Sequence, residues 1–520
     1  MNDLCAKSAT ELSRLLQQKE ITSVELVRAH LERIDRIDSK LRAYTRVFRD
    51  EALADAKTSD EARNQGNALG PLHGLPMSVK ESIDMAGLAS TMGVASRRSL
   101  LAKADGGMVQ MLREAGAIIL GRTNVSQYLM FHECRNPIFG QTANPWSLAH
   151  TPGGSSGGEG AAIAAGLSPA GVGTDIGGSI RVPAAWTGIA GLKPTLDRWT
   201  NKGSNTSLAG QEAVRGQIGP MARTVDDLVL LMRALDPMRM SEIDPRVPPL
   251  PFRDPTTIDV KRLRVGWFVD DGLVPPSVAI GRAIGRTVDV LRDHGCSVRP
   301  FAPPGMPDAI LGYFGALSSD GGAILQRGLE GGAIDPVLEG LRRVARLRPA
   351  IRGALVRVLG LVGEDKVAQL LRVTHGKTVD AFWGVTSALR AYRFTVLDAM
   401  RDAEIDLIVC PAHATPALPH GMAKDCPVAG SASMLFNVLQ FPGGVVPVTR
   451  VRPDETKRAS PRGRLERHAA KVDEASAGLP IGVQLVARPW QDEEVLAAMR
   501  VVERAVSHDD SFPKTPVSPA

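Results

Sequence analysis

One stretch, residues 151–179, constrains the fold and function of this chain more than any other. Its sequence is TPGGSSGGEGAAIAAGLSPAGVGTDIGGS. Two serines, Ser155 and Ser179, each follow a pair of glycines, and the small-residue run between them is too apolar for a linker. Glycine before a serine lets backbone N–H groups turn toward a ligand, because positive φ angles carry no Cβ penalty there. A phosphate-binding loop or a plain turn is the alternative. A phosphate loop would carry lysine or threonine directly after its glycines, which this stretch lacks, so the pattern favours catalysis.

Composition limits the classes of protein that remain. The chain has 520 residues, of which 43% are apolar and 23% charged, which is typical of a globular protein and excludes wholesale disorder. A net charge of +6 is modest for this length and argues only weakly for an anionic partner, so we expect no nucleic acid. The five cysteines are an odd number without a C-x-x-C pair, which indicates a reducing compartment and neither zinc nor disulfides. We expect no metal and no cofactor.

Targeting signals are not visible in the sequence. The N-terminus lacks a basic region followed by an apolar one, so we see no secretory signal. No run reaches the roughly 18 apolar residues that span a bilayer. The expected location is therefore the cytoplasm, and any membrane contact is peripheral.

The order of the predicted elements indicates an α/β fold. Capping boxes at Ser8 and Thr22 each precede an apolar stripe at helical spacing and predict two N-terminal helices. Residues 77–80 alternate as Met-Ser-Val-Lys after a proline, which predicts a strand that ends at Lys80. Further strands are expected at 117–121, 262–268, 406–410 and 480–487, and further helices at 224–235, 278–294 and 491–506. We therefore predict one domain over 1–520, a large mixed twisted sheet covered by helices on both faces.

Two segments stand apart from this pattern. Residues 335–366 carry six arginines among leucines and valines, and Pro349 and Gly353 are expected to break them into two short amphipathic helices. Such helices suit an anionic membrane surface, and the alternative is an ordinary helix pair packed on the core. Residues 450–478 are highly charged and nearly free of large apolar side chains, so we predict a mobile surface loop without chemistry.

A serine needs a base before it becomes a nucleophile. The ten histidines are scattered, and no G-x-S-x-G elbow accompanies them, so a Ser-His-Asp triad lacks support. Lysine can act as the base only if its pKa falls from roughly 10.4 by about three units, which costs roughly 4 kcal/mol. Burial at the end of a strand among neutral hydroxyls would lower the pKa in this way. Lys80 has that position.

Three blocks of sequence together resemble the amidase signature family. They are PMSVKE around Lys80, GGSSGG at 153–158 and GTDIGGSIRVPAAWTGIAGLKPT at 173–195, with 24 positions from Ser155 to Ser179. The resemblance implies a Ser-Ser-Lys triad on a large α/β fold with a mixed sheet. In this triad Ser179 is the nucleophile, Ser155 relays its proton and Lys80 is the base.

The same resemblance implies roles for the residues around the triad. Backbone N–H groups of Ile176, Gly177, Gly178 and Ser179 would form the oxyanion hole. Ser156 would be a hydroxyl that orients Lys80, and a structural turn serine is the alternative.

Four further segments resemble the fatty acid amide hydrolases within this family. They are GPLHGLPMSVKES, NPIFGQTANPW (136–146), FPGGVVPVT (441–449) and GLPIGVQLVARPWQDEE (478–494). This resemblance implies that 335–366 form a helical cap that dips into the membrane and admits acyl chains, and that the enzyme is a homodimer. It makes Leu129, where those enzymes have methionine, a substrate contact through its backbone carbonyl. Trp490 would line the acyl channel, with a core tryptophan as the alternative.

The expected activity is hydrolysis of a small-molecule carboxylic amide, with a fatty acid or other bulky apolar acyl group, through an acyl-enzyme. Two other activities use the same triad. One is the glutaminase subunit of a tRNA-dependent amidotransferase, and the other is an amidase for small aryl or alkyl amides. A scaffold without catalysis is disfavoured because all three triad positions are intact.

Overall fold

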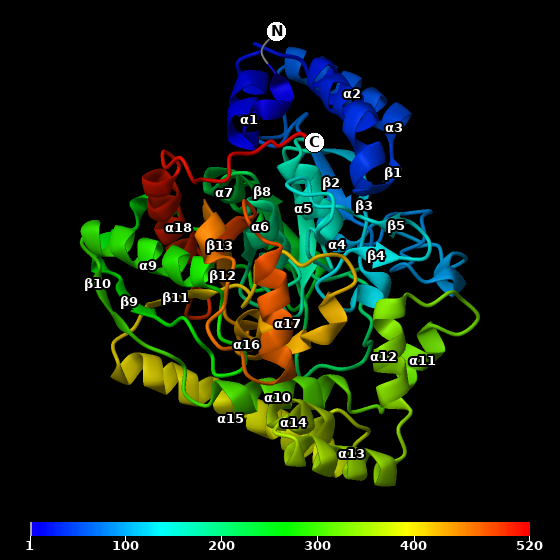
Figure 1. Cartoon of the computed structure of the whole chain (residues 1–520). Helices are drawn as coiled ribbons and strands as arrows, with labels where there is room; N and C mark the ends of the chain where they lie inside the picture. The colour runs from blue at the N-terminus through cyan, green and yellow to red at the C-terminus, as the bar shows by residue number, and fades with distance from the viewer. Residues whose placement is uncertain (1–2, 520) are drawn as a thin grey trace.

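A mixed sheet of 11 strands runs through the centre of the chain (Figure 1), whose residues 3–519 are described by a computed structural model. The strand order is β1-β3-β2-β6-β8-β7-β12-β13-β11-β9-β10. Strand β2 pairs in parallel with β3 and β6, β9 pairs in parallel with β10 and β11, and the remaining neighbours are antiparallel. The strands are β1 (Tyr44–Val47), β2 (Pro76–Lys80), β3 (Ile118–Thr123), β6 (Ala170–Asp175), β7 (Ala190–Lys193), β8 (Gln217–Ala222), β9 (Arg264–Trp267), β10 (Ser297–Pro300), β11 (Leu407–Pro411), β12 (Gly443–Arg450) and β13 (Pro480–Ala487).

Helices surround this sheet, and a small hairpin of β4 (Arg135–Asn136) and β5 (Gly140–Gln141) lies beside it. The helices are α1 (Ala9–Gln17), α2 (Ser23–Leu41), α3 (Arg49–Asn64), α4 (Gly107–Glu114), α5 (Gly157–Ala164), α6 (Arg181–Thr187), α7 (Val225–Ala234), α8 (Pro237–Ile243), α9 (Val278–Asp293), α10 (Met306–Leu317), α11 (Ala323–Gly328), α12 (Pro336–Ala345), α13 (Pro349–Leu361), α14 (Asp365–Val373), α15 (Val379–Asp402), α16 (Ser431–Val438), α17 (Gly463–Glu474) and α18 (Asp492–Val506).

Both faces of the sheet are buried by helices, as predicted. On one face α1, α4, α7, α9 and α18 pack their apolar stripes against alternate strand residues, which include Met77 and Val79 of β2. On the other face α2, α3, α5, α6, α10, α15 and α16 cover the sheet. Because successive side chains of a strand point to opposite faces, Ser78 and Lys80 of β2 point toward this second face. The fold therefore places the lysine on the side where α5 begins.

The predicted elements agree with the structure in kind and in place. Ser8 accepts the backbone N–H of Glu11, and Thr22 forms a full capping box with Glu25. The predicted strands are β3, β9, β11 and β13, and the predicted helices are α7, α9 and α18. The mixed α/β sheet is confirmed.

The prediction of a loop at 450–478 is wrong in part, because this segment contains helix α17. Leu465, Ala469 and Val472 are buried on one face of α17. These three residues are spaced at successive turns of a helix, so they form a narrow apolar stripe that packs against the core. The charged residues beside this stripe pair with one another. Arg458 and Asp473 form a buried ion pair at 2.6 Å.

Residues 335–366 form the two expected helices, α12 and α13, and α14 follows them at the outer edge of the molecule (Figure 1). The break lies before Pro349, which is the first residue of α13, whereas Gly353 lies inside α13. One of the six arginines, Arg352, points inward and donates to carbonyls of Val344, Leu371 and Thr374. No helix among residues 3–519 combines the length and the apolar character needed to cross a bilayer.

Candidate active site

The site forms where three segments meet at one edge of the sheet. Lys80 is the last residue of β2, and the chain leaves the neighbouring parallel strand β6 at Asp175. Because parallel strands end at the same edge, the two strand ends lie together. Ser155 and Ser156 come directly before α5, and the loop 176–180 joins β6 to α6. The topology thus assembles both Gly-Gly-Ser turns around the lysine.

The Lys80 ammonium lies among neutral hydroxyls. Its Nζ donates to Ser155 Oγ at 2.8 Å, to Thr174 Oγ1 at 2.7 Å and to the Thr174 carbonyl at 3.4 Å. The side chain is fully buried, and this desolvation lowers the pKa of Lys80 to about 7, against the opposing attraction of Asp175. A large fraction of the amine is therefore unprotonated near neutral pH and able to accept a proton.

Ser156 reaches Lys80 only through Thr174. Its hydroxyl donates to the Thr174 carbonyl at 3.2 Å and accepts the Thr174 N–H at 3.3 Å, and no hydrogen bond joins it to the lysine within residues 3–519. Its own backbone N–H donates to the Ser179 carbonyl at 3.2 Å. The peptide bond between Gly154 and Ser155 is cis. Ser156 thus ties the segment before α5 to the loop that carries Ser179.

Ser179 is buried, with only 6% of its surface exposed. Its hydroxyl makes no hydrogen bond to another protein group in the described part of the chain. The preceding Gly178 has φ of +105°, and a Cβ there would stand 2.8 Å from Cβ of Ser433 on α16. Glycine is therefore required at position 178 both for its backbone angle and for the close approach to α16.

The N–H groups expected to form the oxyanion hole differ in their availability. The Gly178 N–H donates to Asp175 Oδ1 at 2.8 Å, so this donor is already engaged within the protein. The N–H groups of Ile176, Gly177 and Ser179 have no protein acceptor among residues 3–519. This differs from the prediction, which included Gly178 with the other three.

A buried ion pair, which the sequence analysis missed, lies beneath the loop. Arg181 contacts both carboxylate oxygens of Asp175 at 2.8 and 2.9 Å, and neither side chain is exposed to solvent. Burial alone would raise the pKa of Asp175, but Arg181 outweighs it and holds the carboxyl well below its usual range. Arg181 also donates to Gln484 and Asn437, each at 2.6 Å. An aspartate and an arginine within an otherwise apolar, glycine-rich stretch could have predicted this ion pair, because charged side chains that are buried are normally paired.

The two expected substrate contacts lie in different surroundings. Leu129 and Tyr128 both have left-handed backbone angles, with φ of 56° and 54°, and Leu129 packs against a cluster that includes Leu325 and Leu329 of the α11 region. Trp490 is 38% exposed, which excludes the alternative of a core tryptophan. The backbone N–H of Trp490 donates to Thr195 Oγ1 at 2.9 Å, and no hydrogen bond joins Trp490 to Lys80, Ser155 or Ser179 within the described residues.

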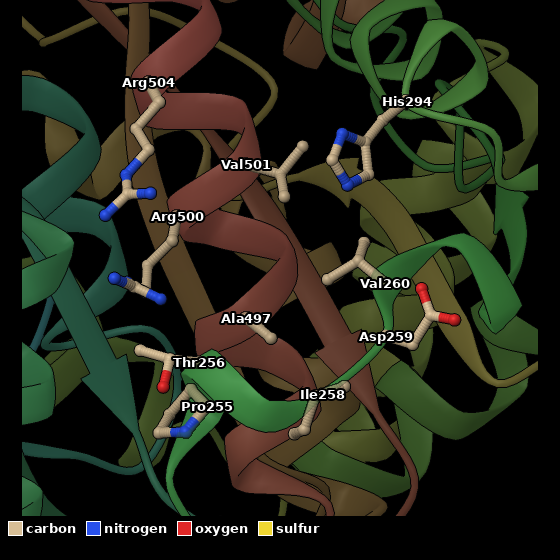
Figure 2. A pocket seen from close by; sticks show the side chains of 10 residues that line it. All are labelled: Pro255, Thr256, Ile258, Asp259, Val260, His294, Ala497, Arg500, Val501 and Arg504. Carbon is tan, nitrogen blue, oxygen red and sulfur yellow. The ribbon is translucent and has the colours of Figure 1, made fainter.

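A hollow lies away from these residues, between the segment 255–260, His294 and helix α18 (Figure 2). Arg500 and Arg504 border it, and both form ion pairs with Asp226, whose single carboxylate balances one of the two positive charges. The residues that line this hollow include none of the predicted site residues.

Comparison with known proteins identifies the family of this chain. A sequence model of the family described as Amidase matches residues 25–496. The chain belongs to the amidase family. This amidase is 39% identical over 449 residues to Fatty-acid amide hydrolase 1 of Sus scrofa, covering 85% of this chain and 77% of that protein. It is 32% identical over 522 residues to a Glutamyl-tRNA(Gln) amidotransferase subunit of Roseiflexus sp. strain RS-1, covering 96% and 97%.

A solved structure of a fatty acid amide hydrolase has the same fold as this amidase. The TM-score is 0.86 at 30% sequence identity, covering 98% of this chain and 87% of that one. The amidase is therefore an amide-hydrolysing enzyme with the large mixed sheet of its family.

Proposed function

We propose that this amidase hydrolyses amides of fatty acids, or of other bulky apolar acids, through an acyl-enzyme formed on Ser179. The observation that carries the mechanism is the contact of 2.8 Å between Lys80 Nζ and Ser155 Oγ, together with the pKa of about 7 that burial gives the lysine. A general base works best when its pKa lies near the working pH and when it is within hydrogen-bond reach of the proton it takes. Lys80 meets both requirements toward Ser155.

The proposed reaction moves one proton along a chain of hydroxyls. Neutral Lys80 takes the proton of Ser155 while Ser155 takes that of Ser179, whose Oγ attacks the amide carbonyl carbon. The N–H groups of Ile176, Gly177 and Ser179 donate to the oxyanion that develops. When the C–N bond breaks, the same chain returns the proton to the leaving nitrogen. Water then attacks the acyl-enzyme by the same route and releases the acid.

An apolar acyl group is supported by the side chains beside the loop that carries Leu129. Leu129, Met130 and Phe131 are partly buried, and they pack against apolar residues of α11 and α12 in one cluster. The named fatty acid amide hydrolases among the relatives support the same substrate class. We infer that Leu129 contacts the scissile amide through its backbone, and that Trp490 borders the acyl group.

Peripheral binding of an otherwise cytoplasmic enzyme to membranes is part of the proposal. On α13, Ile351, Leu355 and Val358 share one face and are 53%, 40% and 53% exposed, and Leu361 at the end of the helix is 88% exposed. An apolar helix face flanked by arginines suits the boundary of an anionic bilayer. Flotation with anionic liposomes should recover the parent protein and should not recover a variant with Ile351→Ser, Leu355→Ser and Val358→Ser. Equal flotation of both would contradict membrane binding by α13.

The oligomeric state is proposed by resemblance alone. We expect a homodimer, and light scattering of the purified chain gives its mass directly.

The nucleophile is tested with a fluorophosphonate, which labels activated serines. Ser179→Ala should abolish labelling, whereas Ser168→Ala, which removes another buried hydroxyl, should leave it intact. Labelling that persists in Ser179→Ala would refute the assignment.

The substrate class is tested with primary fatty amides of increasing chain length set against small aryl amides. A rate that is highest for the small aryl amides would replace the lipid-amide proposal with that alternative.

The second candidate is the glutaminase subunit of an amidotransferase. It is favoured by the relative from Roseiflexus, whose length this chain covers almost completely. Such a subunit releases ammonia for a partner, so the isolated chain should be inactive on lipid amides. Hydrolysis of oleamide by the isolated chain would exclude this candidate.

A further inference from the structure

Every peptide carbonyl in the loop that carries Ser179 is held by a hydrogen bond. The donors come from different parts of the chain, and three of them are side chains. The acceptor and donor pairs are Asp175 O with Asn437 Nδ2 (3.1 Å), Ile176 O with Tyr313 Oη (3.3 Å), Gly177 O with His132 Nε2 (2.9 Å), Gly178 O with Val182 N (2.7 Å) and Ser179 O with Ser156 N (3.2 Å).

The direction of each carbonyl fixes the direction of an N–H group. In a trans peptide the C=O and N–H bonds are coplanar and point opposite ways. The Ile176 carbonyl shares its peptide with the Gly177 N–H, so a donor that holds this carbonyl also aims that N–H. The next peptide is held at both ends, because its carbonyl accepts from His132 and its N–H donates to Asp175. The neighbouring N–H groups thus have little freedom to turn.

Tyr313 reaches the loop from α10, which packs beside α14 and α15. Its side chain is buried, and its hydroxyl stands close to where a Cβ of residue 177 would lie. A side chain at position 177 would therefore push the hydroxyl away. The glycine at 177 is explained by this close approach rather than by a special backbone angle.

His132 reaches the loop from the segment that follows Leu129. A carbonyl oxygen can only accept, so Nε2 of His132 carries the proton in this contact. The ring is fixed by edge contacts with Trp186 and His413, at centroid distances of 6.5 and 5.5 Å, and it lies close to Gly430. Its orientation is thus set before any substrate arrives.

We propose that Tyr313 and His132 are positioning residues of the oxyanion hole, which hold the peptides Ile176–Gly177 and Gly177–Gly178 so that the Gly177 N–H faces the developing oxyanion. This inference rests on the proposed acyl-enzyme at Ser179. Donors that are oriented in advance stabilise the transition state without reorganising during the reaction. Loss of the Tyr313 hydroxyl or of the His132 imidazole leaves the peptide that it holds free to rotate.

The test compares Tyr313→Phe and His132→Ala with the parent on the best amide substrate. Each should lower kcat about tenfold, the worth of one hydrogen bond of ordinary strength, while KM changes less than about twofold. His132→Gln, which retains an N–H donor, should recover part of the loss. The matched control is Tyr392→Phe on α15, because the buried Tyr392 hydroxyl has no partner within residues 3–519. It should keep the parent kcat.

A transition-state analogue separates positioning from a merely structural role. A trifluoromethyl ketone with the substrate's acyl chain forms a tetrahedral adduct with the serine and places an oxyanion in the hole. Its inhibition constant should rise by the same factor by which kcat/KM falls. Rates are normalised to the number of sites that a fluorophosphonate labels, so a misfolded fraction does not count as slower chemistry.

Three outcomes would contradict this inference. Parent-like kcat in both Tyr313→Phe and His132→Ala would overturn the inference while leaving the proposed function intact. A loss in kcat without a matching loss in affinity for the trifluoromethyl ketone would also overturn it. If the parent neither hydrolyses amides nor is labelled, the proposed function fails and this inference falls with it.

Discussion

Replacing Lys80 by methionine should change stability with pH in a way that reports the charge of the buried lysine. The pKa of Lys80 is about 7 in the fold, against an ordinary value of 10.5. Between these values the folded protein binds fewer protons at this group than the unfolded chain does. Stability therefore rises with pH across this window, and Lys80 costs most stability at and below neutral pH.

The magnitude follows from the two pKa values. At about pH 7 the lowered pKa of Lys80 costs about 4 kcal/mol of stability, and at about pH 9.5 this cost falls to about 1 kcal/mol. Lys80→Met removes this cost but also leaves the hydroxyls of Ser155 and Thr174 without a donor, which costs about 1 kcal/mol each at any pH. The variant should be the more stable protein by about 2 kcal/mol near pH 7. That advantage should shrink by about 3 kcal/mol on going to pH 9.5.

Denaturant unfolding of parent and variant at the two pH values measures this difference, in which the titration of groups that do not interact with Lys80 cancels. Lys57→Met, at an exposed position on α3, is the matched control and should give the same stability difference at both pH values. Activity should be lost in Lys80→Met and kept in Lys57→Met. A stability difference between parent and Lys80→Met that is constant from about pH 7 to about pH 9.5 would refute a neutral lysine in the fold.

Three further predictions use other buried groups. Asp175→Asn should lower the free energy of unfolding by about 3–5 kcal/mol, because it leaves Arg181 as an unpaired buried charge, and denaturant unfolding checks this. Burial raises the pKa of Glu159 to about 7, so its carboxylate costs stability as pH rises from about 4.5 to 7, and Glu159→Gln should gain about 3 kcal/mol on the parent between about pH 5 and pH 8. Arg352→Met removes the donor that links α12, α13 and the end of α14, and hydrogen exchange should become faster at 336–373 while β2 and β6 stay protected.

Much of the fold could be predicted from the sequence because its signals are local. The Met-Ser-Val-Lys alternation is a property of four adjacent residues, and the strand it predicts is β2, which ends at Lys80. The capping boxes at Ser8 and Thr22 are equally local, and both helices begin where they indicate. Helix α17 was missed because its apolar face has few residues, and most of its charges lie on the solvent side.

The parts of the site that were missed depend on contacts between distant residues. Tyr313 lies 137 positions from Ile176, and His132 lies 45 positions from Gly177, and neither stands in a motif. Their role follows only from where α10 and the segment after Leu129 pack in three dimensions. Thr174 is different, since it lies within the segment 173–195 that carries the family resemblance, but only the parallel pairing of β2 and β6 shows that its hydroxyl reaches Lys80.

The buried ion pair beneath the loop has a consequence for the base above it. Among the charges that raise the pKa of Lys80, Asp175 contributes most. An unpaired carboxylate there would hold the lysine protonated, and a protonated lysine takes no proton. Arg181 balances this carboxylate at 2.8 Å, and it also keeps Asp175 ionised so that its oxygens accept the N–H groups of Gly178 and Ile180. The Asp175–Arg181 pair therefore shapes the loop that carries Ser179. It also allows burial to set the charge of Lys80, so both Gly-Gly-Ser turns depend on one buried ion pair.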